Sequence, residues 1–303
     1  MNRIITYLMI FLGVISRSLS RKGRGRFGEI IGDILRLASS GRKNITLENI
    51  AKSFPEKDRT WHISVMKDSY RNLGITLAEL LALPSFEEND IREMIKYENA
   101  ELINEIYSRG KGLMLLSGHY GNWELLAYSA GLYSQIPITI IVKPQKNKYA
   151  DELLNKYRTQ AGNEVISMYH SARKVFKILR NGGALALLAD QSASKEDDIF
   201  IEFFGRKAST FQSPAFLALK LDVPIIMGFA VRQPDYTYRV RLQEIRHDDL
   251  DPDEEGIKEL SRRHVKMLEN AIREHPGLWA WQHRRWKHTP KDQEDYVETT
   301  RDK

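Results

Sequence analysis

The pattern of apolar and polar residues changes near residue 110 of the chain. Before that point apolar residues recur at helical spacing, which predicts two helices within residues 45–83, separated at Phe54-Pro55, and a further helix at about 98–109. The second helix covers about 59–83. After residue 110, short continuous apolar runs take over, each near a glycine or proline, at 112–117, 138–142, 184–189 and 224–230. Helices are predicted between these runs at about 123–133, 149–161, 171–180 and 211–220.

Continuous apolar strands that alternate with helices predict an α/β fold, with a mostly parallel sheet flanked by helices. The segment YRVRLQ at 238–243 alternates apolar and polar residues, which predicts an edge strand, and a last helix is predicted at about 256–274. The predicted organisation is a membrane anchor with a basic flank, then a single domain. The anchor covers residues 1–26, and the domain covers 27–303, with a helical part at about 27–110 and an α/β part at about 111–290.

The N-terminal segment predicts contact with a membrane. Residues 4–16 carry no charge, and residues 1–26 contain six basic and no acidic side chains, so the rest of the chain is balanced at 40 basic and 40 acidic residues. A basic cluster beside an apolar segment favours anionic lipid head groups, and basic residues after the segment place the following domain in the cytoplasm. Thirteen residues make a short span or a helix in the interface, since a full span takes about 20. The alternative is a helix docked on the protein's own core.

Composition excludes several kinds of chemistry. The chain has no cysteine, so disulfides, thiolate metal sites and a cysteine nucleophile are absent. The basic excess lies at one end, which argues against a nucleic-acid-binding face over the whole domain. The glycines of Gly23-x-Gly25-x-x-Gly28 match a dinucleotide fingerprint formally, but they follow an apolar segment rather than a strand. No pair of the eight histidines has a convincing metal spacing, and no metal is predicted.

The loop SGHYGNWE at 117–124 carries the candidate chemistry. In parallel sheets ligands bind beyond the carboxyl ends of the strands, where this loop and the loop at 189–198 are predicted to lie. A histidine near neutral pKa with a nearby carboxylate is the minimum set for activating a hydroxyl. We expect His119 to take the proton and Glu124, in the first turn of the following helix, to hold the ring and stabilise the imidazolium. The alternative is a turn histidine and an exposed helix-start glutamate, because acidic residues favour that position.

The tail HRRWK at 283–287 combines cations with aromatic residues near Trp279 and Trp281. One interpretation is contact with a head group, a phosphate or a carrier protein, in which Arg284 and Arg285 bind substrate. The other is a packed C-terminal tail with a solvated basic rim.

Four segments together resemble the bacterial lipid A biosynthesis acyltransferases, in the lysophospholipid acyltransferase superfamily. SGHYGNWELL resembles the His-x4-Asp/Glu signature in its Glu form. LLADQ, followed by FFGRKASTFQSPAFLALKLDVPII, resembles the Asp-Gln, Phe-Phe-Gly-Arg and small-residue helix block. WAWQHRRWKHTP resembles the C-terminal ending, and the apolar N-terminus with its basic flank resembles the inner-membrane anchor. The resemblance covers about residues 1–290 in the family's order.

This resemblance implies acyl transfer from an acyl thioester, usually on acyl carrier protein, to a hydroxyl of a membrane glycolipid. It implies that His119 is the base and that Glu124 orients and polarises it, with Arg158, Asp190 and Gln191 at the substrate. Hydrogen-bond donors for the thioester oxygen are expected either from backbone N–H groups around Gly118–Asn122 or from Arg158.

The predicted function is therefore an acyltransferase at the cytoplasmic face of the inner membrane, with acyl carrier protein, a glycolipid acceptor and anionic lipid as partners. No cofactor is predicted beyond the thioester co-substrate, and nucleic acid is not predicted as a partner. A lysophospholipid acyltransferase, a membrane-bound lipid hydrolase that activates water and a non-enzymatic lipid-binding protein are the alternatives.

Overall fold

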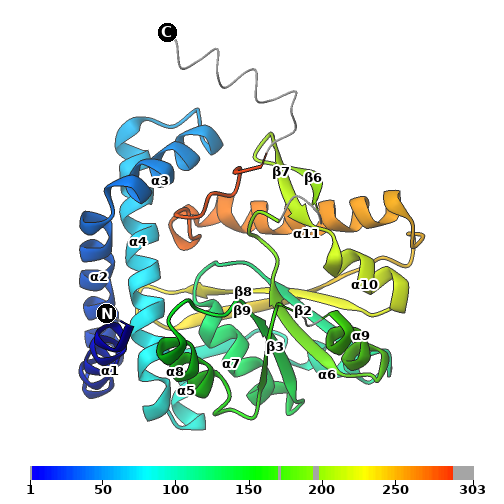
Figure 1. The fold of residues 1–303 in the computed structure, drawn as a ribbon, viewed down its shortest axis with the longest axis horizontal. Helices are drawn as coiled ribbons and strands as arrows, with labels where there is room; N and C mark the ends of the chain where they lie inside the picture. Colours follow the sequence, from blue (N-terminus) through cyan, green and yellow to red (C-terminus); the bar gives the residue numbers. More distant parts are fainter. Residues whose placement is uncertain (1, 170–171, 194–197, 289–303) are drawn as a thin grey trace.

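The computed structural model describes residues 2–169, 172–193 and 198–288. Its N-terminal part is helical, with α1 at Asn2–Ser18, α2 at Arg21–Ala38, α3 at Ser40–Ser53 and α4 at Arg59–Ala82. The break at Phe54-Pro55 and the long helix after it confirm the predictions for this region. Figure 1 shows α2 and α4 side by side along one flank of the sheet.

Helices α2 and α4 approach each other closely because glycines face across their contact. A Cβ on Gly28 would lie 2.4 Å from the Cα of Ile75, and a Cβ on Gly74 would lie 2.2 Å from the main-chain oxygen of Gly28. The glycine-rich stretch that matches a dinucleotide fingerprint is thus part of helix α2, and of its three glycines Gly28 makes the close contact with α4.

Helix α1 uses its two faces differently. On one face the Ser16 hydroxyl donates to the main-chain oxygen of Ala78 at 2.6 Å, and Arg17 donates to Leu81 O and Tyr157 Oη at 3.2 and 2.8 Å. The other face exposes large apolar side chains, namely Ile4, Ile5, Tyr7, Leu8, Ile10, Phe11 and Val14. Across the described residues, no helix is both long enough and apolar enough to span a membrane.

The main sheet has seven strands in the order β1-β9-β8-β2-β5-β3-β4, and every neighbouring pair is parallel except β8 with β9. The four apolar runs are β2 (Leu113–Ser117), β3 (Ile138–Val142), β5 (Ala184–Leu188) and β8 (Ile225–Arg232). The remaining strands are β1 (Ile95–Tyr97), β4 (Glu164–Ser167) and β9 (Tyr238–Ile245). The predicted α/β fold with a mostly parallel sheet is confirmed.

Both faces are buried along the central strands, which explains why β2, β3, β5 and β8 are continuously apolar, whereas β9 alternates and exposes one face. Met114 and Leu116 join one core cluster, which includes residues of α9 (Ala172–Arg180), α10 (Ser213–Leu221) and α11 (Glu254–Glu274). Leu113 joins a second cluster on the opposite face. Four further helices contribute to that cluster: α5 (Glu88–Met94), α6 (Glu101–Tyr107), α7 (Trp123–Ser134) and α8 (Lys148–Arg158).

Two features of the sheets differ from the predictions. Strand β9 is not an edge strand, because the three-residue β1 pairs with it on its outer side, from Ile95 with Tyr238 to Tyr97 with Val240. A separate antiparallel hairpin of β6 (Asp198–Phe203) and β7 (Arg206–Phe211) also lies between β5 and α10 in the chain. Residues 194–197 of the loop expected at the functional edge lie outside the described residues.

Candidate active site

The register of two parallel strands brings His119 and Asp190 together. In the β2–β5 pair Ser117 lies opposite Leu188, and each functional residue follows its strand by two positions. The two side chains therefore meet at the carboxyl edge of the sheet, where the chain turns from β2 toward α7. Asp190 is 3% exposed and so belongs to the floor of the site.

Asp190 holds the imidazole of His119 in place. Its Oδ1 lies 2.7 Å from His119 Nδ1, while its Oδ2 accepts from the main-chain N–H of His119 at 2.7 Å and from Trp279 Nε1 at 2.8 Å. With the carboxylate on the Nδ1 side, the proton lies on Nδ1 and Nε2 keeps its lone pair. That is the tautomer in which a histidine accepts a proton from a substrate.

The two groups shift each other's pKa. Burial acts to lower the pKa of His119, but the charge and hydrogen bond of Asp190 outweigh burial and raise it. For Asp190, burial acts to raise the pKa, and the interactions with His119, His283 and Trp279 hold it well below its ordinary value. Asp190 is therefore ionised and paired, and His119 is a stronger base than a free imidazole.

The Nε2 side of His119 faces Gln191 and a second histidine that was not predicted. Gln191 Nε2 lies 3.2 Å from His119 Nε2 and 3.1 Å from His283 Nε2. The rings of His283 and Trp123 lie 5.0 and 5.2 Å from that of His119, between centroids. Burial, followed by the charge of His119, lowers the pKa of His283 to about 4, so this second histidine is neutral. Its place in the tail, more than 160 residues beyond His119, gave no sign of this contact.

Glu124 does not hold the ring of His119, contrary to the expectation from the five-residue spacing. Its carboxylate forms a two-pronged ion pair with Arg158, with Oε2 accepting from Nε at 2.8 Å and Oε1 from Nη2 at 2.7 Å. The physical reason is that Glu124 lies in the first turn of α7, beside the last residue of α8. Its charge still acts on His119, whose pKa it raises after the larger effects of burial and Asp190.

The loop around Gly118–Asn122 is a scaffold for the site. Asn122 is buried and caps α7, since its Oδ1 accepts from Leu125 N at 2.9 Å while its Nδ2 donates to Glu79 Oε2 at 2.6 Å. Gly118 lets Asp190 approach, because a Cβ there would lie 3.2 Å from Oδ2 of Asp190.

Of the backbone N–H groups around Gly118–Asn122 that were expected as donors to the thioester oxygen, four are engaged within the protein. Those of the four residues 119–122 donate to Asp190 Oδ2 and to the main-chain oxygens of Gly118, Leu278 and Ala230. Arg158, the other expected donor, uses three of its five N–H groups for Glu124 and for Asn155 Oδ1, and within the described residues the other two have no hydrogen-bond partner.

The two tail arginines differ from each other. Arg285 is 1% exposed, and its guanidinium donates to Ser209 O and to Thr210 Oγ1 on β7. Its predicted contact with substrate is therefore corrected, because the guanidinium is engaged inside the fold. Arg284 is exposed and lies next to His283.

Residues 276–285 pack between the loop that carries His119 and helix α3. The main-chain N–H of Ala280 donates to His119 O at 2.9 Å, and Leu278 O accepts from Gly121 N at 2.9 Å. Asn49 of α3 donates to the main-chain oxygens of Trp281 and His283, at 3.1 and 2.9 Å. The packed-tail interpretation thus describes most of this segment.

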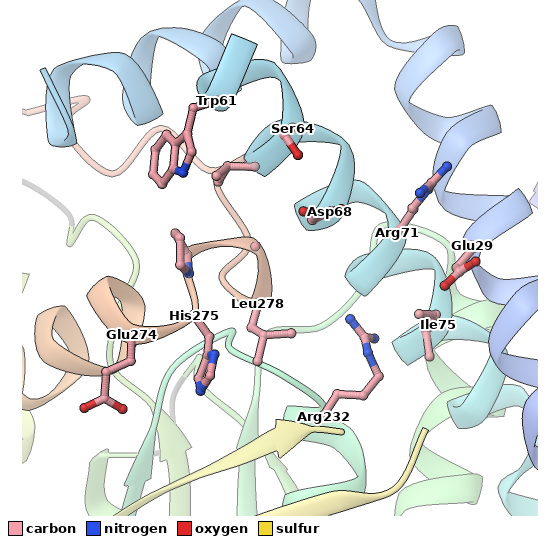
Figure 2. Close-up of a pocket in the computed structure, with 13 residues that line it drawn as sticks. Glu29, Trp61, Ser64, Asp68, Arg71, Ile75, Arg232, Glu274, His275 and Leu278 are labelled. Atoms are coloured by element: carbon pink, nitrogen blue, oxygen red, sulfur yellow. The ribbon is translucent and has the colours of Figure 1, made fainter. Parts of the chain in front are cut away.

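A cavity of about 440 Å³ lies on the other side of residues 276–278 (Figure 2). It is lined from α2, α4, the end of β8 and the segment after α11, with charges of both signs: Arg71, Arg232, Glu29, Asp68 and Glu274. Leu278 separates this cavity from Gly121. The cavity therefore borders the loop that carries His119 without containing the His119–Asp190 pair.

The fold and the site define a class of protein. At the carboxyl edge of a parallel sheet, a buried aspartate fixes a histidine whose Nε2 carries the lone pair and contacts Gln191. With an acceptor hydroxyl in place of that contact, this arrangement can deprotonate the hydroxyl for attack on a carbonyl carbon. Across the described parts of the chain, no cluster of three or more histidine, aspartate or glutamate side chains is placed to hold a metal ion.

The chain belongs to the bacterial lipid A biosynthesis acyltransferase family, which matches residues 1–288. It is similar to the lipid A biosynthesis palmitoleoyltransferase of Escherichia coli (strain K12), with 22% identity over 269 residues, 87% of this chain and 84% of the relative. It is also similar to a lipid A biosynthesis acyltransferase of Haemophilus influenzae, with 19% identity over 278 residues, 91% of this chain and 84% of the relative. Family membership supports an acyltransferase that acts in lipid A biosynthesis.

Proposed function

We propose that this protein transfers a fatty acyl chain from an acyl carrier protein thioester to a hydroxyl of a lipid A precursor, while attached to the cytoplasmic face of the inner membrane. The observation that supports the chemistry most directly is the 2.7 Å contact between His119 Nδ1 and Asp190, which leaves Nε2 as the base. Membership of the family supports the substrate class.

In the proposed reaction His119 Nε2 takes the proton of the acceptor hydroxyl as its oxygen attacks the thioester carbonyl carbon. Asp190 stabilises the imidazolium that forms. The tetrahedral intermediate then collapses, the carbon–sulfur bond breaks, and the imidazolium returns the proton to the leaving thiolate. The products are an ester and a free thiol, and no acyl-enzyme forms.

We assign to Arg158 the role of stabilising the negative charge that develops on the thioester oxygen. This assignment is supported by the backbone N–H groups of residues 119–122, which are already engaged within the protein. Glu124 fixes the guanidinium of Arg158 through two hydrogen bonds, so its proposed role is to position that cation. Glu124 thus remains part of the proposed catalytic set, acting through Arg158.

Membrane attachment is supported by the exposed apolar face of α1 and by the six basic residues among positions 1–26. An amphipathic helix of this kind lies in the interface with its apolar face in the lipid. Attachment in this way would keep the inner face of α1 packed against α4.

A mass-spectrometric acyl-transfer assay tests the proposal. Membranes are prepared with the wild type, with His119→Ala, or with His275→Ala as a control at an exposed histidine outside the His119–Asp190 pair. Each receives acyl carrier protein loaded with mixed chain lengths, a lipid A precursor and lysophospholipids. We expect an acylated lipid A precursor from the wild type and the control, and a loss of at least ~100-fold in His119→Ala. Acylated lysophospholipid instead would move the acceptor to phospholipid, and free fatty acid without transfer would favour a hydrolase. Near-normal turnover of a folded His119→Ala protein would contradict the mechanism.

A further inference from the structure

Arg42 is an exposed cation fixed beside the active site. It lies near the start of α3, and its Nη1 donates to the main-chain oxygen of Gln282 at 3.1 Å. The next residue, His283, lies with its ring 5.0 Å from that of His119. Within the part of the chain that the structure describes, this is the one hydrogen bond of the Arg42 guanidinium, which has five N–H groups, so most of its donors stay available.

Lys143 is an exposed cation at the same edge of the sheet. It follows the last residue of β3, and β3 pairs in parallel with β5, the strand that leads into Asp190. The charges of Arg42 and Lys143 both reach His283, where they add to burial and to the charge of His119 in lowering its pKa. The hydrogen bond to Gln282 places Arg42 at the rim of the site, and the end of β3 places Lys143 there, although the two cations come from distant parts of the chain.

The carboxylates of the site do not balance these cations. Asp190 is engaged by His119 and Trp279, and Glu124 is engaged by Arg158. In the described parts of the chain neither Arg42 nor Lys143 forms an ion pair with a carboxylate. Arg284, next to His283, is a third exposed cation without such a partner there. The rim therefore carries surplus positive charge directly beside a site that takes a hydroxyl and a thioester.

We propose that Arg42 and Lys143 form a subsite for a phosphate group at the rim of the His119 site, with Arg284 adding to its charge. An arginine fork combined with a lysine point charge suits a phosphate, which offers several oxygens and up to two negative charges. The inference rests on the proposed function, because that function supplies two sources of phosphate. One is a phosphate on the lipid acceptor, and the other is the phosphodiester that joins the pantetheine arm to the carrier protein.

Kinetics with and without the phosphate separate the two sources. Arg42→Ala, Lys143→Ala and the double variant are compared with Arg180→Ala and Lys220→Ala, two exposed cations that lie just before β5 and β8 begin, at the opposite edge of the sheet. Each enzyme is assayed with acyl carrier protein or an acyl-N-acetylcysteamine thioester as donor, and with a phosphorylated or dephosphorylated acceptor.

We expect each rim variant to lower kcat/KM about tenfold or more with the phosphate-bearing substrate, and the controls to stay at the wild-type value. This loss in kcat/KM should disappear when the phosphate is removed from the substrate whose phosphate binds at the subsite. The substrate for which that happens is the source of the phosphate. Unchanged kcat/KM in the double variant, or an equal loss with every substrate form, would overturn the proposal.

Binding of inorganic phosphate, followed as a rise in the thermal unfolding midpoint, gives a readout that does not depend on acyl transfer. We expect the rise in the wild type and in both controls, and its loss in the double variant. If the wild type binds phosphate at these residues but transfers no acyl group, the proposed function fails and the subsite stands. If the midpoint rises equally in the double variant, the subsite fails.

Discussion

Replacing Asp190 with asparagine tests whether Asp190, rather than Glu124, is the carboxylate that orients and stabilises the imidazole of His119. Asp190 makes two hydrogen bonds to this residue, both at 2.7 Å, and a third at 2.8 Å with Trp279. Asparagine has nearly the same shape, but one of its two polar atoms is an NH₂ group. The orientation that keeps both donors of Oδ2 satisfied turns this NH₂ group toward His119 Nδ1, so the ring loses its acceptor. The variant also loses the negative charge that stabilises the imidazolium.

The size of the effect follows from these contacts. One charge-assisted hydrogen bond is worth about 1.5–3 kcal/mol, and each 1.36 kcal/mol in the barrier is about tenfold in rate. Loss of the ring contact alone thus costs about 10- to 150-fold. Stabilisation of the wrong tautomer adds to this, and we expect kcat to fall by about 10²- to 10⁴-fold.

The pH profile of Asp190→Asn gives a second readout. Because Asp190 raises the pKa of His119 against the effect of burial, its removal lowers that pKa, and the acid limb of kcat/KM moves to lower pH. The assay is acyl transfer to a lipid A precursor from pH 5 to 9, with Glu124→Gln as the comparison and circular dichroism as the check on folding. A folded Asp190→Asn enzyme with a rate within threefold of the wild type and an unmoved acid limb would refute this assignment of the two carboxylates.

Three predictions concern stability. Gly121→Ala should lower the free energy of unfolding by about 2 kcal/mol or more, because the residue has φ +57° and a Cβ there would lie 1.7 Å from a carbonyl oxygen of β8. Gly41→Ala is the control, since a Cβ at that position meets nothing within 4 Å, and urea titration measures both variants. Burial, with the charge of Arg285, lowers the pKa of His264 to about 4 from 6.5, so the unfolded chain binds a proton there that the folded protein does not. Stability should therefore fall as pH drops from about 6.5 toward 4, and His264→Leu should reduce that fall in thermal melts; an unchanged slope would contradict it. Arg285→Met should lower the melting temperature, because it leaves two acceptors on β7 buried and unpaired. The matched change at the exposed Arg284 should not, and equal melting temperatures of the two variants would argue against a structural role of the Arg285 guanidinium.

The sequence predicted the strands with the strongest signal and missed the weakest. Runs such as 138–142 are apolar at every position because both faces of the sheet are covered, so the prediction and β3 coincide. Strand β1 has only three residues, too few to show a period. Without β1, the alternation at 238–243 predicted an edge strand, since alternation reports one exposed face and gives no information on the strand's neighbours.

The candidate site was predictable in most of its members, with His283 missed, but not in its pairing. His119 and Asp190 were candidates because each follows a predicted apolar strand. Their contact depends on β5 lying next to β2, and the sequence pattern gives no information on the order of the strands. Glu124 was favoured as the partner of His119 because it is near in sequence. The structure directs it to Arg158 instead, through the packing of α7 beside α8.

The position of residues 276–285 has a consequence for synthesis of the protein. The ribosome makes α1 well before these residues, yet they supply the Trp279 bond to Asp190 and the contacts of Asn49 with residues 232 and 234 positions away. If α1 attaches to the membrane as proposed, a nascent chain can do so while Asp190 still lacks its bond from Trp279. In the proposed mechanism acyl transfer becomes possible only once residues 276–285 are in place. A protein shortened before residue 276 should therefore attach to lipid vesicles through α1 and yet transfer no acyl group.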